Sequence, residues 1–203
     1  METINNNENY FSRDNQRPTD AFTPADQNTE NSPHVLSDNQ DTFPGGKFFS
    51  LKFHATSGAM EAKADQTKAG IHTLRIEFAT PIEKGSKLYD WRNKITFQIT
   101  RSDLPKFLMV VLGISTDAKL QHYGANNDKS LSLRYQKSKY GVSLFIQASK
   151  GSQSCSIPVA LTDTILVGHL GLTQYVKNFA KLSTEAVLMS FARLAKLEGN
   201  ATI

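Results

Sequence analysis

The chain has 203 residues, of which 39% are hydrophobic and 21% charged, so it is long enough to bury a core as one domain with or without a tail. Its uncharged apolar runs are far shorter than the roughly 20 residues that a helix needs to cross a bilayer, and its Asn-rich, acidic start is unlike a secretory signal or a mitochondrial presequence. A single cysteine, Cys155, can form neither an internal disulfide nor a thiolate metal site, so we expect a cytoplasmic protein with no membrane partner.

The formal net charge of +4 hides an uneven distribution of charge. Residues 1–46 contain two basic and eight acidic side chains, whereas residues 47–203 contain 21 basic and 11 acidic ones. Residues 1–46 also lack apolar periodicity, which predicts a disordered acidic tail. A strongly basic body is typical of proteins that bind a polyanion. The tail either solvates the chain, or contacts the basic face in competition with the polyanion, or contacts a protein partner.

The first half of the body alternates between apolar and polar side chains, which is the period of strands with one buried face. This pattern predicts strands over residues 47–53, 72–78 and 89–99, with a weaker one over 59–64. In the strand over 89–99, Tyr89 and Trp91 share the core-facing side with Ile95. After Thr100 the period becomes helical, with Ser102 as the expected N-cap and Gly113 as the expected end.

The second half repeats this order with a period of about 60 residues. Strands are expected over 120–124, 130–136, 140–149 and 152–159, and a helix capped by Thr162 follows them. The predicted fold is therefore α+β, with two antiparallel four-stranded sheets and helices in which ββββα occurs twice. We divide the chain into a tail (1–46), a nucleic-acid-binding domain (47–182) and a C-terminal helix that Ser183 starts (183–203). That last helix either packs in its own core or belongs to an oligomer interface.

The side of each strand that faces away from the core is predicted to be basic and rich in amides, with Glu77 and Asp90 almost its only acids. Two aromatic side chains interrupt it, as stacking on splayed bases requires; the alternative is that they bury a second face of the sheet. The candidate nucleic-acid-binding residues are these aromatics and the basic residues of the faces and loops, namely Lys47, Phe48, Lys52, Arg75, Lys84, Lys87, Arg92, Lys94, Arg134, Lys137, Lys139 and Phe145.

Three segments resemble the Whirly family of plant single-stranded-DNA-binding proteins: Phe78-Ala79-Thr80-Pro81, Tyr89-Asp90-Trp91-Arg92-Asn93-Lys94, and Phe97-Gln98-Ile99-Thr100 leading into the first helix. Residues 122–124, 129–131 and 141–144 agree more loosely, so the resemblance covers about 46–179. It implies two antiparallel four-stranded sheets, helices that hold a homotetramer, and binding of single strands with little sequence preference. At residues 45–49 the chain departs from that family's Lys-Gly-Lys-Ala-Ala motif. Kinetoplastid mitochondrial RNA-binding proteins and positive-cofactor-type coactivators share the fold, so RNA is an alternative ligand.

Signatures of catalysis are absent from the sequence. Its five histidines are scattered without a carboxylate or second histidine at ligand spacing, and neither a Gly-x-Ser-x-Gly elbow nor a phosphate-binding Gly-rich loop occurs. We expect no enzyme, no cofactor and no metal. The hypothesis is a nucleoid-associated single-stranded-DNA-binding protein for replication, recombination or transcription. Its alternatives are an RNA-binding protein or chaperone and a non-enzymatic protein-interaction factor.

Overall fold

The computed structural model describes residues 50–139 and 141–199, and the helices, strands and contacts given below belong to these residues. The first sheet has the order β1-β2-β3-β4, and every neighbouring pair of strands is antiparallel. Its strands are β1 (Ser50–Ala55), β2 (Gly58–Gln66), β3 (His72–Ala79) and β4 (Ile95–Gln98). The weak alternation predicted over 59–64 is thus confirmed as a full strand of the sheet.

The second sheet repeats this arrangement in the order β5-β6-β7-β8, again antiparallel throughout. Its strands are β5 (Asp117–Tyr123), β6 (Lys129–Ser138), β7 (Gly141–Lys150) and β8 (Gln153–Ala160). Helix α1 (Leu104–Val111) follows the first sheet, α2 (Leu161–Lys177) follows the second, and α3 (Thr184–Leu197) ends the described chain. The predicted α+β fold with ββββα occurring twice is confirmed.

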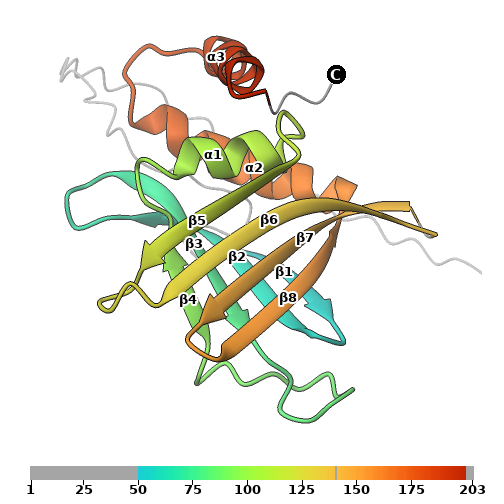
Figure 1. The fold of residues 1–203 in the computed structure, drawn as a ribbon. Helices are drawn as coiled ribbons and strands as arrows, with labels where there is room; N and C mark the ends of the chain where they lie inside the picture. Colours follow the sequence, from blue (N-terminus) through green and yellow to red (C-terminus); the bar gives the residue numbers. More distant parts are fainter. Residues whose placement is uncertain (1–49, 140, 200–203) are drawn as a thin grey trace, which may run out of the picture. The chain divides into compact units, whose positions relative to one another are not determined.

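The two sheets pack their apolar faces against each other, and Figure 1 shows their strands crossing. The inward side chains of both sheets belong to one core, which includes Phe78 and Phe97 from the first sheet and Leu144 and Ile157 from the second. Cys155 is part of this core, as its position in an alternating strand predicted, and burial raises the pKa of its thiol to about 11. The core also includes Val187, Phe191 and Ala195 of α3, so one face of that helix packs within its own chain.

Helix α2 packs against α1 and against strands of both sheets, and two glycines make this approach close. A Cβ atom on Gly168 would lie 2.6 Å from the Leu112 Cδ2 atom. One on Gly171 would lie 2.7 Å from Leu108 Cδ2 and 2.8 Å from Leu74 Cδ1. The α2 backbone therefore lies directly on the side chains of α1 and β3, and the three helices gather on one side of the sheets (Figure 1).

The strand predicted over 89–99 is wrong in its first half. Strand β4 begins only at Ile95, because the Asp90 carboxylate accepts the backbone N–H groups of Arg92 and Asn93 and the Asn93 amide, which turns the chain. Tyr89 and Trp91 are consequently half-buried rather than core residues. The Tyr89 hydroxyl donates to the Ala55 carbonyl at 3.2 Å, which attaches this loop to the end of β1.

The caps of the first two helices also differ from the prediction. Helix α1 has Asp103 rather than Ser102 at its N-cap, and α2 has Ala160 rather than Thr162. Ala160 still pairs with Ser143 in the sheet, so the chain leaves β8 directly into the helix without a capping side chain. Gly113 ends α1 as expected, with φ of 73°. The predicted start of α3 is confirmed, since the Ser183 hydroxyl accepts the Ala186 N–H at 3.1 Å.

Candidate nucleic-acid interface

Each sheet has one outer face, and the predicted site residues divide between these two faces and their loops. Lys52, Arg75 and Lys94 belong to the first sheet and its edge, whereas Arg134 and Phe145 belong to the second. Because the inner faces pack together, the two groups lie on opposite sides of the common core.

The outer face of the first sheet carries more acid than the sequence analysis expected. Strand β2 places Glu61 and Asp65 there. Glu61 lies between Lys52 of β1 and Glu77 of β3 in the register, and Asp65 lies opposite Thr73 of β3. The prediction of a nearly acid-free face is therefore wrong for this sheet. The sequence predicts only a weak extended piece in this segment, because small alanines alternate with its charges. The pairing of β2 with β1 and β3 is what places Glu61, Lys63 and Asp65 on the outer face.

Glu77 is the centre of a group of charges on that face. Its side chain is only 3% exposed, and its Oε2 atom lies 2.8 Å from the Lys94 ammonium and 3.0 Å from the Lys63 ammonium. Burial raises the pKa of the Glu77 carboxyl, but the hydrogen bonds from Lys94 and Lys63 outweigh burial and hold that pKa below its ordinary value. Lys63 also approaches Glu61 at 3.6 Å, and Lys52 approaches Glu61 at 3.9 Å.

Arg75 is engaged in the same way by Asp65. Its Nε and Nη2 atoms donate to the two carboxylate oxygens at 2.9 and 3.2 Å, and Gln98 donates to the same carboxylate at 2.7 Å. Burial raises the pKa of Asp65, but the bonds from Arg75 and Gln98 outweigh it and leave that pKa below its ordinary value. Cations held by carboxylates in the sheet are poorly placed for phosphate, because the carboxylates repel it.

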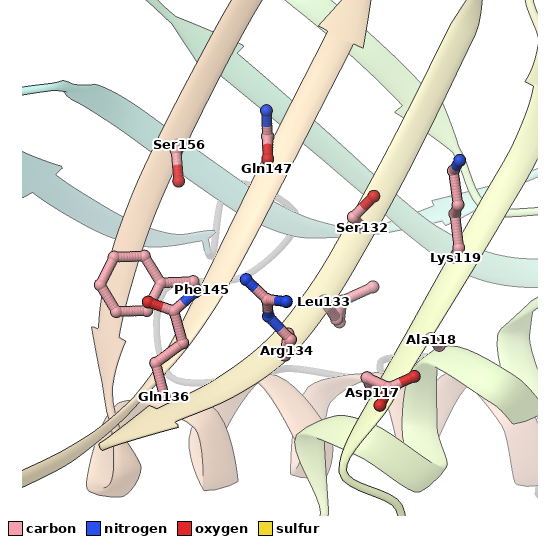
Figure 2. A pocket seen from close by; sticks show the side chains of 10 residues that line it. All are labelled: Asp117, Ala118, Lys119, Ser132, Leu133, Arg134, Gln136, Phe145, Gln147 and Ser156. Carbon is pink, nitrogen blue, oxygen red and sulfur yellow. The ribbon is translucent and has the colours of Figure 1, made fainter. Parts of the chain in front are cut away.

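The outer face of the second sheet is different in composition. Arg134 of β6 and Phe145 of β7 are directly opposite each other in the register, and Ser132 and Gln147 form the adjacent pair. These side chains line an open concavity of about 430 Å³ together with Lys119, Gln136 and Ser156. Figure 2 shows Arg134, Phe145 and Gln147 projecting from neighbouring strands on the same side of the sheet. Among the residues that line this concavity, Asp117 is the only carboxylate.

Arg134 is exposed and Phe145 is half-buried, so both reach the solvent side of the sheet. Within the described part of the chain Arg134 has no ion pair, in contrast to Arg75. Phe145 lies outside the core cluster, on the face opposite to Leu144 and Ile146. A planar aromatic ring beside a guanidinium and amides can stack on a base while the cation contacts a phosphate.

The remaining candidates lie in loops or outside the described residues. Lys137 and Lys139 are exposed at the β6–β7 hairpin, which continues the outer face of the second sheet. Lys84, Lys87 and Arg92 are exposed in the loop between β3 and β4. Lys47 and Phe48 fall outside the residues that the structure describes. Whether each of these side chains contacts nucleic acid stays a prediction.

Sequence reasoning missed Lys119, which lines the concavity next to Ser132. The expected strand started at Leu120, but β5 begins at Asp117. The alternation of Asp117, Lys119 and Gln121 with Ala118 and Leu120 was the available signal, and it was too short and too interrupted to be read as the strand start. The alternation ends at His122, where a positive φ of 64° and a shift of register interrupt the pairing of β5 with β6.

No group of three or more His, Cys, Asp or Glu side chains in residues 50–139 and 141–199 is arranged to hold a metal ion. Within the same ranges, none of the helices has the length and apolar character needed to span a membrane.

Neither a protein-family model nor a curated protein matches the sequence. Among solved structures, the chain is similar to the plant transcriptional regulator PBF-2, with 12% identity and a TM-score of 0.44 over 74% of this chain and 96% of that one. It is similar to WHY3 from Arabidopsis thaliana, with 12% identity and a TM-score of 0.42 over 75% of this chain and 96% of that one. It is also similar to WHY1 from Arabidopsis thaliana, with 13% identity and a TM-score of 0.44 over 66% of this chain and 97% of that one. All three are Whirly proteins, the family that the Tyr-Asp-Trp segment resembles.

The charges around Glu77 predict how stability depends on pH. The folded-state pKa values of Glu77 and Asp65 lie below their ordinary values, so both carboxylates stabilise the fold above about pH 4 and lose this effect as the pH falls through the folded values. We expect Glu77→Gln to lower the free energy of unfolding at pH 7 by about 1–3 kcal/mol, because Lys63 and Lys94 lose their charged acceptor. The variant should also lose less stability than the native chain between pH 7 and pH 3.

Urea denaturation of both proteins across that pH range measures the effect. Glu83→Gln, in the exposed part of the β3–β4 loop, is the matched control and should leave the curve unchanged. Equal stability of Glu77→Gln and the native chain at pH 7 would show that the ion pairs around Glu77 do not stabilise the fold.

Proposed function

We propose that this protein binds single strands of nucleic acid, DNA in preference, with little sequence specificity, on the outer face of the second sheet. The observation that carries the proposal is the direct pairing of Arg134 with Phe145 in a concave face where Asp117 is the only lining carboxylate. The proposed role is to hold and protect exposed strands in replication, recombination or transcription. No catalytic step is part of the proposal.

The chemistry of this face suits an unpaired strand better than a duplex. Every base has a flat π-face, so stacking on Phe145 requires an unstacked base but no particular sequence. The amides of Gln136 and Gln147 can both donate and accept hydrogen bonds, which suits base edges of several kinds. Arg134, Lys119 and the lysines of the β6–β7 hairpin supply positive charge along the path of a phosphate backbone.

The first sheet offers much less for the same ligand. A phosphate approaching Arg75 or Lys94 would meet the carboxylates of Asp65 and Glu77, which already accept hydrogen bonds from these cations. Replacing such short charged bonds by contacts with a phosphate brings little net gain. The second sheet is therefore the proposed binding face, and the first sheet's cations are proposed to act mainly within the fold.

Substitutions at Arg134 and Phe145 test this proposal. Arg134→Glu should weaken binding of a labelled mixed-sequence oligodeoxynucleotide by about tenfold or more at low salt, because it removes a phosphate contact and adds repulsion. Phe145→Ala should weaken it by about 1–3 kcal/mol through loss of one stacked base. Fluorescence anisotropy at several salt concentrations measures both, and binding by the native chain should weaken steeply with salt.

Arg193→Glu is the matched control. It changes the net charge by the same amount at an exposed position on α3, which does not line the concavity of the second sheet. Undiminished binding by a folded Arg134→Glu, Phe145→Ala double variant would remove this face from the site. RNA and duplex DNA of the same sequence serve as competitors. Displacement mainly by RNA would favour the RNA-binding alternative, and no binding of any oligonucleotide would favour a protein-interaction factor.

The acidic residues of 1–46 are proposed to compete with nucleic acid for the basic body. The opposite signs of the two segments support this proposal. Deleting residues 1–46 should raise the affinity for an oligodeoxynucleotide several-fold at low salt, and high salt should abolish the difference because it screens the attraction. A deletion variant with unchanged affinity at low salt would leave the tail without this role.

Self-association through the helices is the remaining part of the proposal, with a homotetramer as the expected form. Its support is an apolar groove of about 370 Å³ between α1, α2 and β7, beside which Leu161, Ile165 and Leu166 of α2 are 44–49% exposed. Ile165→Glu should lower the mass of the assembly in sedimentation analysis, because it would bury a charge in the interface. Ile82→Glu, at an exposed loop position, is the control and should leave the mass unchanged. A native chain that sediments as a 22.5 kDa monomer would contradict this part.

A further inference from the structure

A second cavity lies between the β2–β3 turn and the carboxyl end of α2, apart from the concave face of the second sheet. It consists of two adjoining hollows of about 350 and 240 Å³ that share Ile71, His72, Arg101, Asn178 and Phe179. Their combined size is in the range of small-molecule sites, about 300–1,000 Å³. None of these residues lines the concavity around Arg134 and Phe145.

The walls of this cavity are held in place by Asn178. Its Oδ1 atom accepts the His72 N–H at 2.9 Å, and its Nδ2 atom donates to the His72 carbonyl at 2.9 Å, across 106 residues of sequence. The β2–β3 turn is fixed as well, since the Ile71 N–H donates to Thr67 Oγ1 at 3.1 Å and the Gly70 N–H donates to the Thr67 carbonyl at 2.9 Å. Both sides of the cavity are thus preformed by hydrogen bonds.

The polar lining of the cavity favours an anion. Arg101, His72 and Lys177 line it, and no carboxylate is among its lining residues. The carboxylate nearest to Arg101 in the chain, Asp103, accepts hydrogen bonds from the Tyr123 and Thr100 hydroxyls at 2.7 and 3.0 Å.

The end of a helix normally carries negative polarity that would oppose an anion. Here the last carbonyl groups of α2 already accept hydrogen bonds within the helix end. The Tyr175 carbonyl accepts the Asn178 N–H, the Val176 carbonyl accepts the Phe179 N–H, and the Gln174 carbonyl accepts the Asn178 amide. The helix end is therefore a weak obstacle to a phosphate held by Arg101.

The apolar part of the lining favours a flat ring. Ile71, Tyr175 and Phe179 are each half-buried, and the rings of Tyr175 and Phe179 lie 5.0 Å apart in a tilted arrangement. An aromatic and aliphatic wall beside a guanidinium matches a ligand with a planar base at one end and a phosphate at the other. We propose that this cavity binds a nucleoside phosphate, with the phosphate at Arg101 and the base against Ile71 and Phe179.

Such a ligand has two sources, a free mononucleotide or the terminal nucleotide of a strand. The first is tested by titrating the full chain with deoxyadenosine 5′-monophosphate in a calorimeter. We expect saturable binding that Arg101→Ala weakens by about tenfold or more and that Arg193→Ala leaves unchanged. Phe179→Leu should weaken binding of the mononucleotide but not of inorganic phosphate, because it alters only the apolar wall.

The second source is tested with a short oligodeoxynucleotide that either carries or lacks a 5′-phosphate. If the strand end is the ligand, the phosphate raises affinity in the native chain, and Arg101→Ala removes this increment. Arg134→Glu should lower the affinity of both oligonucleotides equally, so failure of the sheet proposal is distinguished from failure of this one. The cavity proposal is overturned if neither ligand form depends on Arg101, or if mononucleotide binding is lost in Arg134→Glu but kept in Arg101→Ala.

Discussion

The shared core of the two sheets is the constraint on which every other feature of this protein depends. Each sheet buries one face against the other, so each retains a single face for solvent or a ligand. Because side chains alternate across a strand, a shift of one residue would exchange the core and the outer face. The positions of Phe97 and Ile95 inside therefore require Thr96 and Gln98 outside, and the positions of Leu144 and Ile146 inside require Phe145 outside.

The two halves of the chain share a layout but not a surface chemistry. In the first sheet, β2 brings Glu61 and Asp65 between the cations of its neighbours, and the result is a set of internal ion pairs around Glu77. In the second sheet, β6 occupies the corresponding second place and brings Ser132 and Arg134 instead. The repeat thus produces two sheets of equal topology. In the second, Asp117 of β5 lies opposite Arg134 in the register, but the Arg134 guanidinium has no ion pair among the described residues.

Hydrogen bonds between the two halves of the chain hold the outer faces of the two sheets in a fixed relation. The Tyr123 hydroxyl donates to Asp103 at the start of α1, and burial together with this bond raises the Tyr123 pKa to about 12. The Lys129 ammonium donates to the Thr96 carbonyl at 3.3 Å, and the Gln153 amide donates to the Asn93 carbonyl at 3.2 Å. Two turns of the second sheet are thereby attached to the edge of the first, so the loop that contains Arg92 lies beside the second sheet.

The sequence predicted the order of the strands and the two polar faces, because alternation records burial directly. It failed where a side chain overrides the local period, as at Asp90, whose carboxylate turns the chain inside an otherwise alternating segment. It also failed where the informative residue lies in another strand. Arg75 and Arg134 look equivalent in sequence, and only the structure shows that Asp65 bonds Arg75. Arg134 lies between Asp117 and Phe145 in the register and has no ion pair among the described residues. What separates the two arginines is therefore whether a carboxylate bonds the guanidinium, and the surroundings in the sheet, rather than the residue type, make Arg134 the candidate for a phosphate contact.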